Sequence, residues 1–177
     1  MSRERSTVHQ LLSGMSDSML KYGLYIWVEG SSGPTMGKKA RILFVCTDGL
    51  PRCQMAEGFT RYFAGANVVV GSAGSGDQSA NPYCHWAMNE AGIDVTHIAA
   101  SPLEGLDLSS FSYVVTLSGE TEGNLATVPS GVQLEHWRLP DPTKVRGNPQ
   151  DLIMTFRAVR NATEKKVKDL LTRVLRA

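Results

Sequence analysis

RILFVCTDGLPRCQMAEGFTRYFA, residues 41–64, is the stretch from which the fold of the chain can be predicted. It begins with a short apolar run, 41–45, rich in residues that favour β-structure, which predicts a strand buried on both faces. Residues 53–64 come next, with apolar side chains at a helical spacing, at Met55, Phe59, Tyr62 and Phe63. A loop that starts on Cys46 and ends on Arg52 joins this strand to this helix.

The rest of the domain continues the same alternation. Further strands are predicted at residues 67–70, 113–117 and 132–137, and the loop GSAGSGD (71–77) is expected to end the first of them. Further helices are predicted at residues 81–91 and 149–175. Strands that alternate with helices predict a three-layer α/β/α fold with a four-stranded parallel sheet. Ligands bind such sheets at the carboxyl ends of the strands, and the loop after residue 45 lies there.

The first forty residues differ from the rest of the chain. They hold short amphipathic stretches and end in the small-residue linker EGSSGPTMGKKA, residues 29–40. We therefore predict an N-terminal extension over residues 1–40, partly disordered, and one domain over residues 41–177.

Composition excludes several classes of function. The chain has 177 residues and a formal net charge of +1, so it carries no electrostatic footprint for nucleic acid or an anionic membrane. No apolar run approaches the roughly 18–20 residues that span a bilayer, and the N-terminus does not resemble a secretory signal. We therefore expect a cytoplasmic protein with reduced thiols. Its three cysteines, at positions 46, 53 and 84, do not form a metal-binding pattern, and no metal is expected.

The loop after the first strand has the residues for nucleophilic chemistry on an oxyanion. Cys46 and Arg52 are spaced as C-x5-R, and a loop of this length can turn its backbone N–H groups inward to form an anion nest. The start of the following helix adds further N–H groups, and a guanidinium binds tetrahedral oxyanions in a bidentate manner. The same positive field favours a thiolate at Cys46. The loop residues are Thr47, Asp48, Gly49, Leu50 and Pro51.

At this point the sequence resembles the low-molecular-weight protein tyrosine phosphatases and their relatives, the thiol-coupled arsenate reductases. The resemblance runs from about residue 40 to the C-terminus, through LFVCTDGLPRCQMAEGFTRYFAG, SAGSGDQSANPYCHWAMNEAGIDV, YVVTLSG, LEHWRLPDP and FRAVR. QMAEG, HWRLPDP and FRAVR favour the arsenate reductase branch. The resemblance implies that Cys46 is the nucleophile, Arg52 the clamp for the oxyanion and the transition state, and Asp141 the general acid. Without it, Asp141 reads as a turn residue.

The loop departs from the family pattern, C-x-G-N-x-C-R-S. Gly49 replaces the asparagine, Asp48 replaces the glycine and brings a carboxylate near the anion, and Pro51 removes one N–H donor. These changes weaken or retune anion binding. An alternative is therefore a non-catalytic family member that binds oxyanions or senses thiol redox state.

Cys53 stands where the family has a serine that hydrogen-bonds the nucleophile. The resemblance makes Cys46 and Cys53 neighbours, so Cys53 is a candidate redox partner, the alternative being a small residue at a helix start. The position of a resolving cysteine after VVTL is taken by Ser118, and no cysteine follows it. A reductase would then need Cys53 or an external thiol, such as a glutaredoxin or a low-molecular-weight thiol. The substrate is expected to be arsenate or a phosphate monoester; Thr143-Lys144 after Asp141-Pro142 argues against an aromatic phosphotyrosine slot.

Three further residues have two readings each. Cys84 is expected to be a buried helix cysteine rather than part of a Cys-His pair with His85. Glu57 is expected to be a solvated helix residue, although a core-facing brace or a cation ligand, as in reductase relatives, is the alternative. Trp137, which lies with His136 next to the acid loop, is expected either to pack the floor of the site or to be structural.

Overall fold

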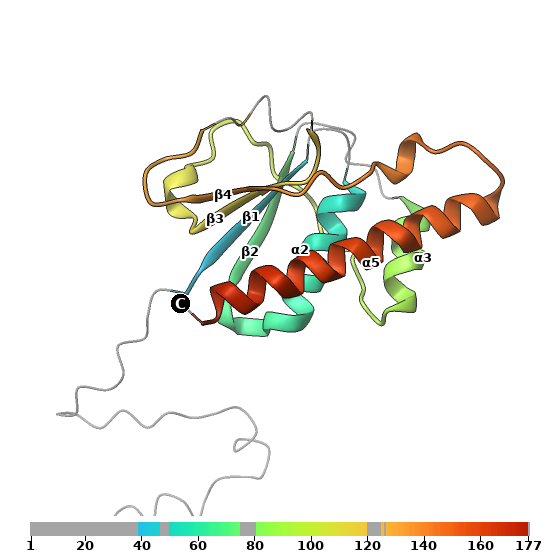
Figure 1. Ribbon diagram of the computed structural model, residues 1–177, viewed down its shortest axis with the longest axis horizontal. Coiled ribbons are helices and arrows are strands. Elements are labelled where there is room, and N and C mark those ends of the chain that lie inside the picture. The colour runs from blue at the N-terminus through green and yellow to red at the C-terminus, as the bar shows by residue number, and fades with distance from the viewer. Residues whose placement is uncertain (1–38, 47–49, 75–80, 120–124, 126, 177) are drawn as a thin grey trace, which may run out of the picture. The chain divides into compact units, whose positions relative to one another are not determined.

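The computed structural model describes residues 39–46, 50–74, 81–119, 125 and 127–176 (Figure 1). Four strands form one parallel sheet in the order β2-β1-β3-β4. The strands are β1 (Arg41–Cys46), β2 (Val69–Gly74), β3 (Tyr113–Thr116) and β4 (Gln133–His136). The helices are α2 (Pro51–Ala64), α3 (Pro82–Glu90) and α5 (Pro149–Val174). The α/β fold with a four-stranded parallel sheet is therefore confirmed.

The two faces of the sheet are covered differently. One face carries the main core, in which Ile42 and Phe44 of β1 pack against apolar side chains of α2, α3 and α5. The opposite face carries a smaller cluster around Leu43, Val45 and Val114. In the described part of the chain this second face is covered by the segment around residues 103–111, which includes the single turn η3 (Leu108–Ser110), and by Leu125, Val128 and Val132.

The predicted bounds of two elements were wrong. β2 was expected at residues 67–70 and its end was read as the loop 71–77, yet the strand runs over Val69–Gly74. Pairing explains the difference, because Val69 lies opposite Arg41 and the register continues to Gly74 opposite Cys46. The second half of the strand consists of small residues, which do not give the pattern of a strand in the sequence. Asn67, in contrast, belongs to the turn η2 (Gly65–Asn67). α2 also begins two residues earlier than predicted, at Pro51.

Helix α5 begins and is anchored as its sequence favours. Asn148 and Asp151 form a capping box, in which each side chain accepts a hydrogen bond from the other's backbone N–H. Arg157 and Arg160 of the FRAVR motif both pair with Glu90 at the end of α3, at 2.7 and 3.1 Å. These contacts tie the end of α3 to α5.

The predicted extension over residues 1–40 lies, apart from its last two residues, outside the described part of the chain and stays a prediction. Within the described residues, no helix combines the length and the apolar character needed to cross a membrane.

Gly58 provides a test of the packing of α2. A Cβ atom at this position would lie 2.7 Å from Cγ1 of Val95, so Gly58→Ala should destabilise the fold by about 1–3 kcal/mol. The measurement is urea unfolding followed by far-UV circular dichroism. Gly71→Ala is the matched control, because a Cβ there meets no atom within 4 Å. Equal stability of the Gly58 variant and the wild type would contradict the close packing.

Candidate active site

The candidate residues meet at the carboxyl edge of the sheet. Strand β1 lies between β2 and β3, so the order of the strands along the sheet reverses beside β1. Parallel sheets bind ligands at the carboxyl ends of the strands at such a point. Cys46 is the last residue of β1, and Leu50 and Pro51 are the N-cap and first residue of α2. Of the predicted anion loop, Thr47, Asp48 and Gly49 lie outside the described residues.

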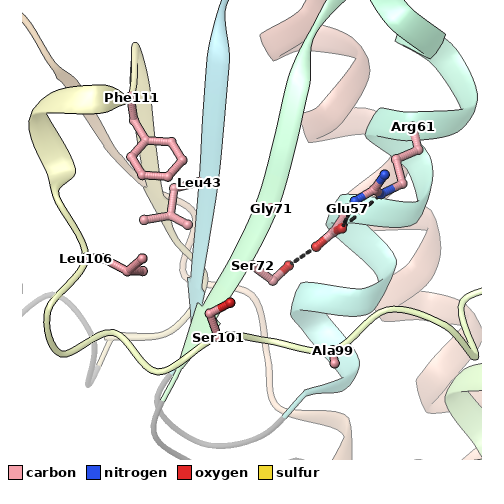
Figure 2. Close-up of a pocket in the computed structure, with 9 residues that line it drawn as sticks. All are labelled: Leu43, Glu57, Arg61, Gly71, Ser72, Ala99, Ser101, Leu106 and Phe111. Carbon is pink, nitrogen blue, oxygen red and sulfur yellow. Dashed lines mark hydrogen bonds and ion pairs between the residues drawn. The ribbon is translucent and has the colours of Figure 1, made fainter.

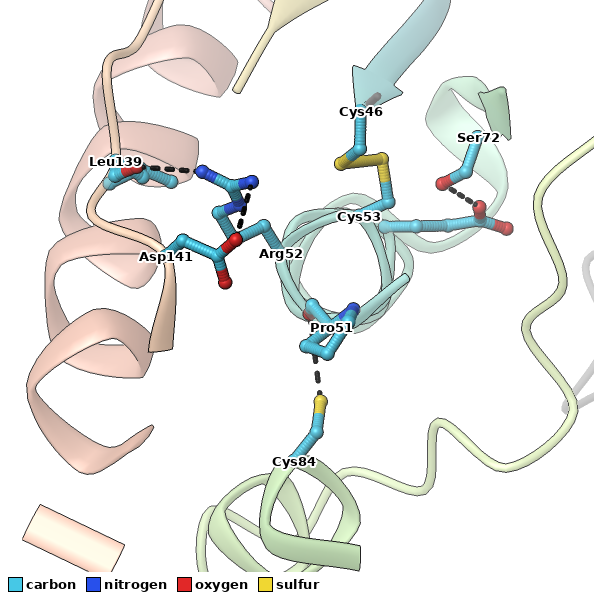
Figure 3. The surroundings of a disulfide bond; sticks show 9 residues. Cys46, Pro51, Arg52, Cys53, Ser72, Cys84, Leu139 and Asp141 are labelled. Carbon is cyan, nitrogen blue, oxygen red and sulfur yellow. Dashed lines mark hydrogen bonds and ion pairs between the residues drawn. A yellow bond between two sulfur atoms is a disulfide. The ribbon is translucent and has the colours of Figure 1, made fainter. Parts of the chain in front are cut away.

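Cys46 and Cys53 are joined by a disulfide (Figure 3). Their Cα atoms lie 6.3 Å apart, and both side chains belong to the main core, with Cys53 fully buried. Cys53 lies in the first turn of α2 on the side that faces the end of β1. The two sulfur atoms that the resemblance made neighbours therefore lie within bonding reach of each other.

Arg52 extends from the same helical turn toward the segment that follows β4. Its side chain is 3% exposed; Nη1 donates a hydrogen bond of 2.9 Å to the Leu139 carbonyl, and Nη2 lies 3.5 Å from Oδ2 of Asp141 (Figure 3). A buried guanidinium requires such partners, because an unpaired charge in the interior is costly. The structure thus brings the predicted clamp and the predicted acid into contact.

Asp141 serves as a turn residue and also faces the site. Its Oδ1 caps the single turn η4 (Pro142–Lys144) by accepting bonds from the Thr143 amide and hydroxyl, at 2.9 and 2.7 Å. Its side chain is 9% exposed. Both readings of the sequence therefore describe part of its environment, and sequence reasoning missed the two residues that hold the pair, Leu139 and Thr143.

The Cys46–Cys53 disulfide and the contact between Arg52 and Asp141 are the features with which known proteins can be compared. The sequence profile of the family "Low molecular weight phosphotyrosine protein phosphatase" matches residues 41–177. The chain belongs to this family. It is 37% identical over 134 residues to an arsenate reductase of Shouchella clausii, covering 75% of this chain and 95% of that protein. An arsenate reductase of Bacillus subtilis is 32% identical over 128 residues, covering 72% and 92%.

A solved structure of this phosphatase family's fold agrees. An arsenate reductase in an oxidized state superposes with a TM-score of 0.66 at 25% identity, over 77% of this chain and 99% of that one. The expectation of an enzyme of the phosphatase or arsenate reductase kind is confirmed at that level. The roles of individual residues stay predictions.

Cys84 is a buried structural cysteine of this family member, as expected. It lies on α3, on the opposite side of α2 from the disulfide, and its thiol donates to the Pro51 carbonyl at 3.5 Å. Burial raises the pKa of Cys84 to about 12, so this thiol stays protonated and unreactive near neutral pH.

Glu57 was expected to be solvated, and that prediction was wrong. The residue is 4% exposed. Its Oε2 accepts a hydrogen bond of 2.6 Å from the Ser72 hydroxyl, and its Oε1 accepts two hydrogen bonds from Arg61 (Figure 2). This arrangement corresponds to the core-facing brace, because it ties α2 to β2 at one side of a pocket of about 260 Å³. The available signals were Arg61 one turn later, and the small serine on the neighbouring strand.

Two further expectations concern metal ligands and Trp137. The described residues contain no group of three or more histidine, cysteine, aspartate or glutamate side chains that could hold a metal ion. Trp137 packs on Phe44 with ring centroids 5.5 Å apart, and its indole N–H donates to Glu135. It therefore supports the strand end from the helix-covered face of the sheet.

The cysteine geometry gives a prediction for the reduced chain. Mild oxidation with hydrogen peroxide should lower its mass by about two hydrogen atoms, because two neighbouring thiols close one disulfide. Intact-protein mass spectrometry measures this loss. Cys46→Ser and Cys53→Ser should each abolish it, and Cys84→Ala should retain it. A loss that persists in Cys53→Ser would mean that Cys46 pairs with a different thiol.

Proposed function

We propose that the chain is a cysteine-dependent arsenate reductase in which Cys46 is the nucleophile and Cys53 resolves the intermediate. The observation that carries the proposal is the Cys46–Cys53 disulfide, since a resolving thiol must reach the sulfur that carries the arsenic. Arsenate reductase relatives at 32–37% identity support arsenate as the substrate. Cys53 supplies the internal thiol that the region after β3 lacks, where Ser118 stands.

In the first step the Cys46 thiolate attacks arsenic. An As–S bond forms and an As–O bond breaks, and the leaving oxygen takes a proton from Asp141 and departs as water. Arg52 and the loop residues 47–51 would hold the remaining oxygens. Asp141 and Arg52 are suited to these roles because they lie in contact within the same buried site.

In the second step the Cys53 thiolate attacks the sulfur of Cys46. The S–S bond forms while the S–As bond breaks, and its electron pair stays on arsenic, which leaves as arsenite in the +3 state. Two thiols have then given up two electrons. An external dithiol protein such as a glutaredoxin, or two equivalents of a low-molecular-weight thiol, would return them by reducing the disulfide.

The test is arsenate-dependent oxidation of a thiol donor, measured with dithiothreitol and with a glutaredoxin system coupled to NADPH. Cys46→Ser should lower turnover by more than about 10³-fold, as loss of a nucleophile does. Cys53→Ser should remove turnover with the protein donor and keep part of it with the small thiol, which can attack the arsenylated Cys46 directly. Cys84→Ala is the matched control and should turn over like the wild type.

Two results would contradict this scheme. An active Cys46→Ser enzyme would exclude Cys46 as the nucleophile, and a Cys53→Ser enzyme with unchanged rates on both donors would exclude its resolving role. A reduced wild type that turns over neither arsenate nor a phosphate monoester would favour the oxyanion-binding or redox-sensing alternative, with the loop spoiled at Asp48 and Pro51.

Phosphate monoester hydrolysis is the second candidate, favoured by the family match over residues 41–177. It uses the same attack by Cys46 and the same acid, but water rather than Cys53 completes the reaction. With para-nitrophenyl phosphate as substrate, we expect Cys53→Ser to hydrolyse at least as fast as the wild type, because a serine hydroxyl is a better donor to a thiolate than a thiol. A Cys53→Ser variant that loses both activities equally would indicate damage to the loop.

A further inference from the structure

The two carboxylate oxygens of Asp141 have different surroundings. Oδ1 accepts two hydrogen bonds from Thr143, 2.9 Å from the amide nitrogen and 2.7 Å from the hydroxyl. Oδ2 is buried, accepts no hydrogen bond from any described residue, and lies 3.5 Å from Nη2 of Arg52. One oxygen is therefore anchored to the turn, and the other is directed toward the arginine.

This difference decides which oxygen can carry a proton. A neutral carboxyl group holds its proton on one oxygen, and an oxygen that already accepts two hydrogen bonds has its lone pairs occupied. The proton of a neutral Asp141 therefore belongs on Oδ2. Two donors from a single residue also fix the plane of the carboxyl group, so Oδ2 stays directed toward the guanidinium that would clamp the oxyanion.

We propose that Thr143 is a positioning residue for this reaction: its hydroxyl holds Oδ1 of Asp141 so that Oδ2 delivers the proton to the leaving oxygen. The inference rests on the proposed function, because it requires Asp141 to be the general acid. The Thr143 hydroxyl donates to Asp141, and the Thr143 carbonyl accepts a hydrogen bond of 3.0 Å from Nη1 of Arg146. The hydroxyl is therefore expected to act on the reaction through Asp141.

The same turn occurs elsewhere in the chain without these surroundings. Thr96 donates to Asp94 through its amide and hydroxyl at 2.9 and 2.7 Å, and there both residues are exposed. The turn by itself is therefore an ordinary structural motif. Burial of the carboxyl group and the adjacent arginine distinguish the turn at Asp141, and Thr96 offers a control with matched hydrogen bonds.

The experiment measures kcat and KM for arsenate in full-length Thr143→Val, Thr143→Ser and Thr96→Val, each in the wild-type and the Asp141→Asn background. Valine removes the hydroxyl and keeps the shape of the side chain, while serine keeps the donor. Thr143→Val should lower kcat roughly tenfold, a part of the ~10²–10⁴-fold that general acid catalysis contributes, with KM within about twofold. Thr143→Ser should restore kcat, and Thr96→Val should leave it unchanged.

The Asp141→Asn background separates positioning from structure. If Thr143 acts through the acid, Thr143→Val should have no further effect there, whereas a purely structural loss would be the same in both backgrounds. Unfolding midpoints identify any variant that fails to fold, and Thr143→Ala then replaces the valine variant. An unchanged kcat in Thr143→Val, or an equal loss in both backgrounds, overturns the inference while the proposed function stands. Unchanged turnover in Asp141→Asn itself, or an inactive wild type, overturns the acid assignment and the inference together.

Discussion

The burial of the Arg52 guanidinium is the constraint on which the rest of the site depends. A charge that is almost fully removed from water must be compensated, because desolvation of an unpaired cation costs several kcal/mol. The chain meets this requirement with the Leu139 carbonyl and the Asp141 carboxylate, which follow the last strand of the sheet. The segment after β4 is thereby held against the first turn of α2. One side chain thus links the beginning of the domain to residues almost ninety positions later.

The disulfide lies on the other side of the same helical turn. Cys53 faces β1 and bonds to Cys46, while Arg52 faces the segment after β4 (Figure 3). Successive helical residues point about 100° apart, so neighbouring positions can serve two different walls of one site. The disulfide and the Arg52–Asp141 contact are therefore both anchored on the first turn of α2, and apolar side chains of this helix pack against the sheet and α5.

Much of this arrangement could be predicted from the sequence, and the parts that could not be predicted depend on contacts between distant segments. The junction of β1 and α2 was predictable, because an apolar strand and a helical apolar spacing are local signals. The far half of β2 was not, since Gly71 to Gly74 are small residues that become a strand through pairing with β1. Glu57 was misread for a similar reason: Arg61 one turn later is a local signal, but the burial of Glu57 also depends on pairing with Ser72 of β2, whose position beside α2 is set by the fold. The contacts of Cys46, Arg52 and Asp141 are now known, and their chemical roles stay predictions.

Two departures from the family pattern, Pro51 in place of a cysteine and Cys53 in place of a serine, can be explained together from the geometry of the first turn of α2. Proline at position 51 costs the helix little, because the first N–H of a helix has no partner within it and the fixed φ of proline suits that position. Positions 51 and 53 point to nearly opposite sides of the helix, since two residues correspond to about 200° of rotation. Position 51 accordingly lies beside Cys84 of α3, and position 53 lies beside Cys46 of β1. A cysteine at position 51, as in the family pattern, would thus lie on the side of α3. The cysteine of this chain, at position 53, lies instead at the end of β1, where it reaches the sulfur of Cys46.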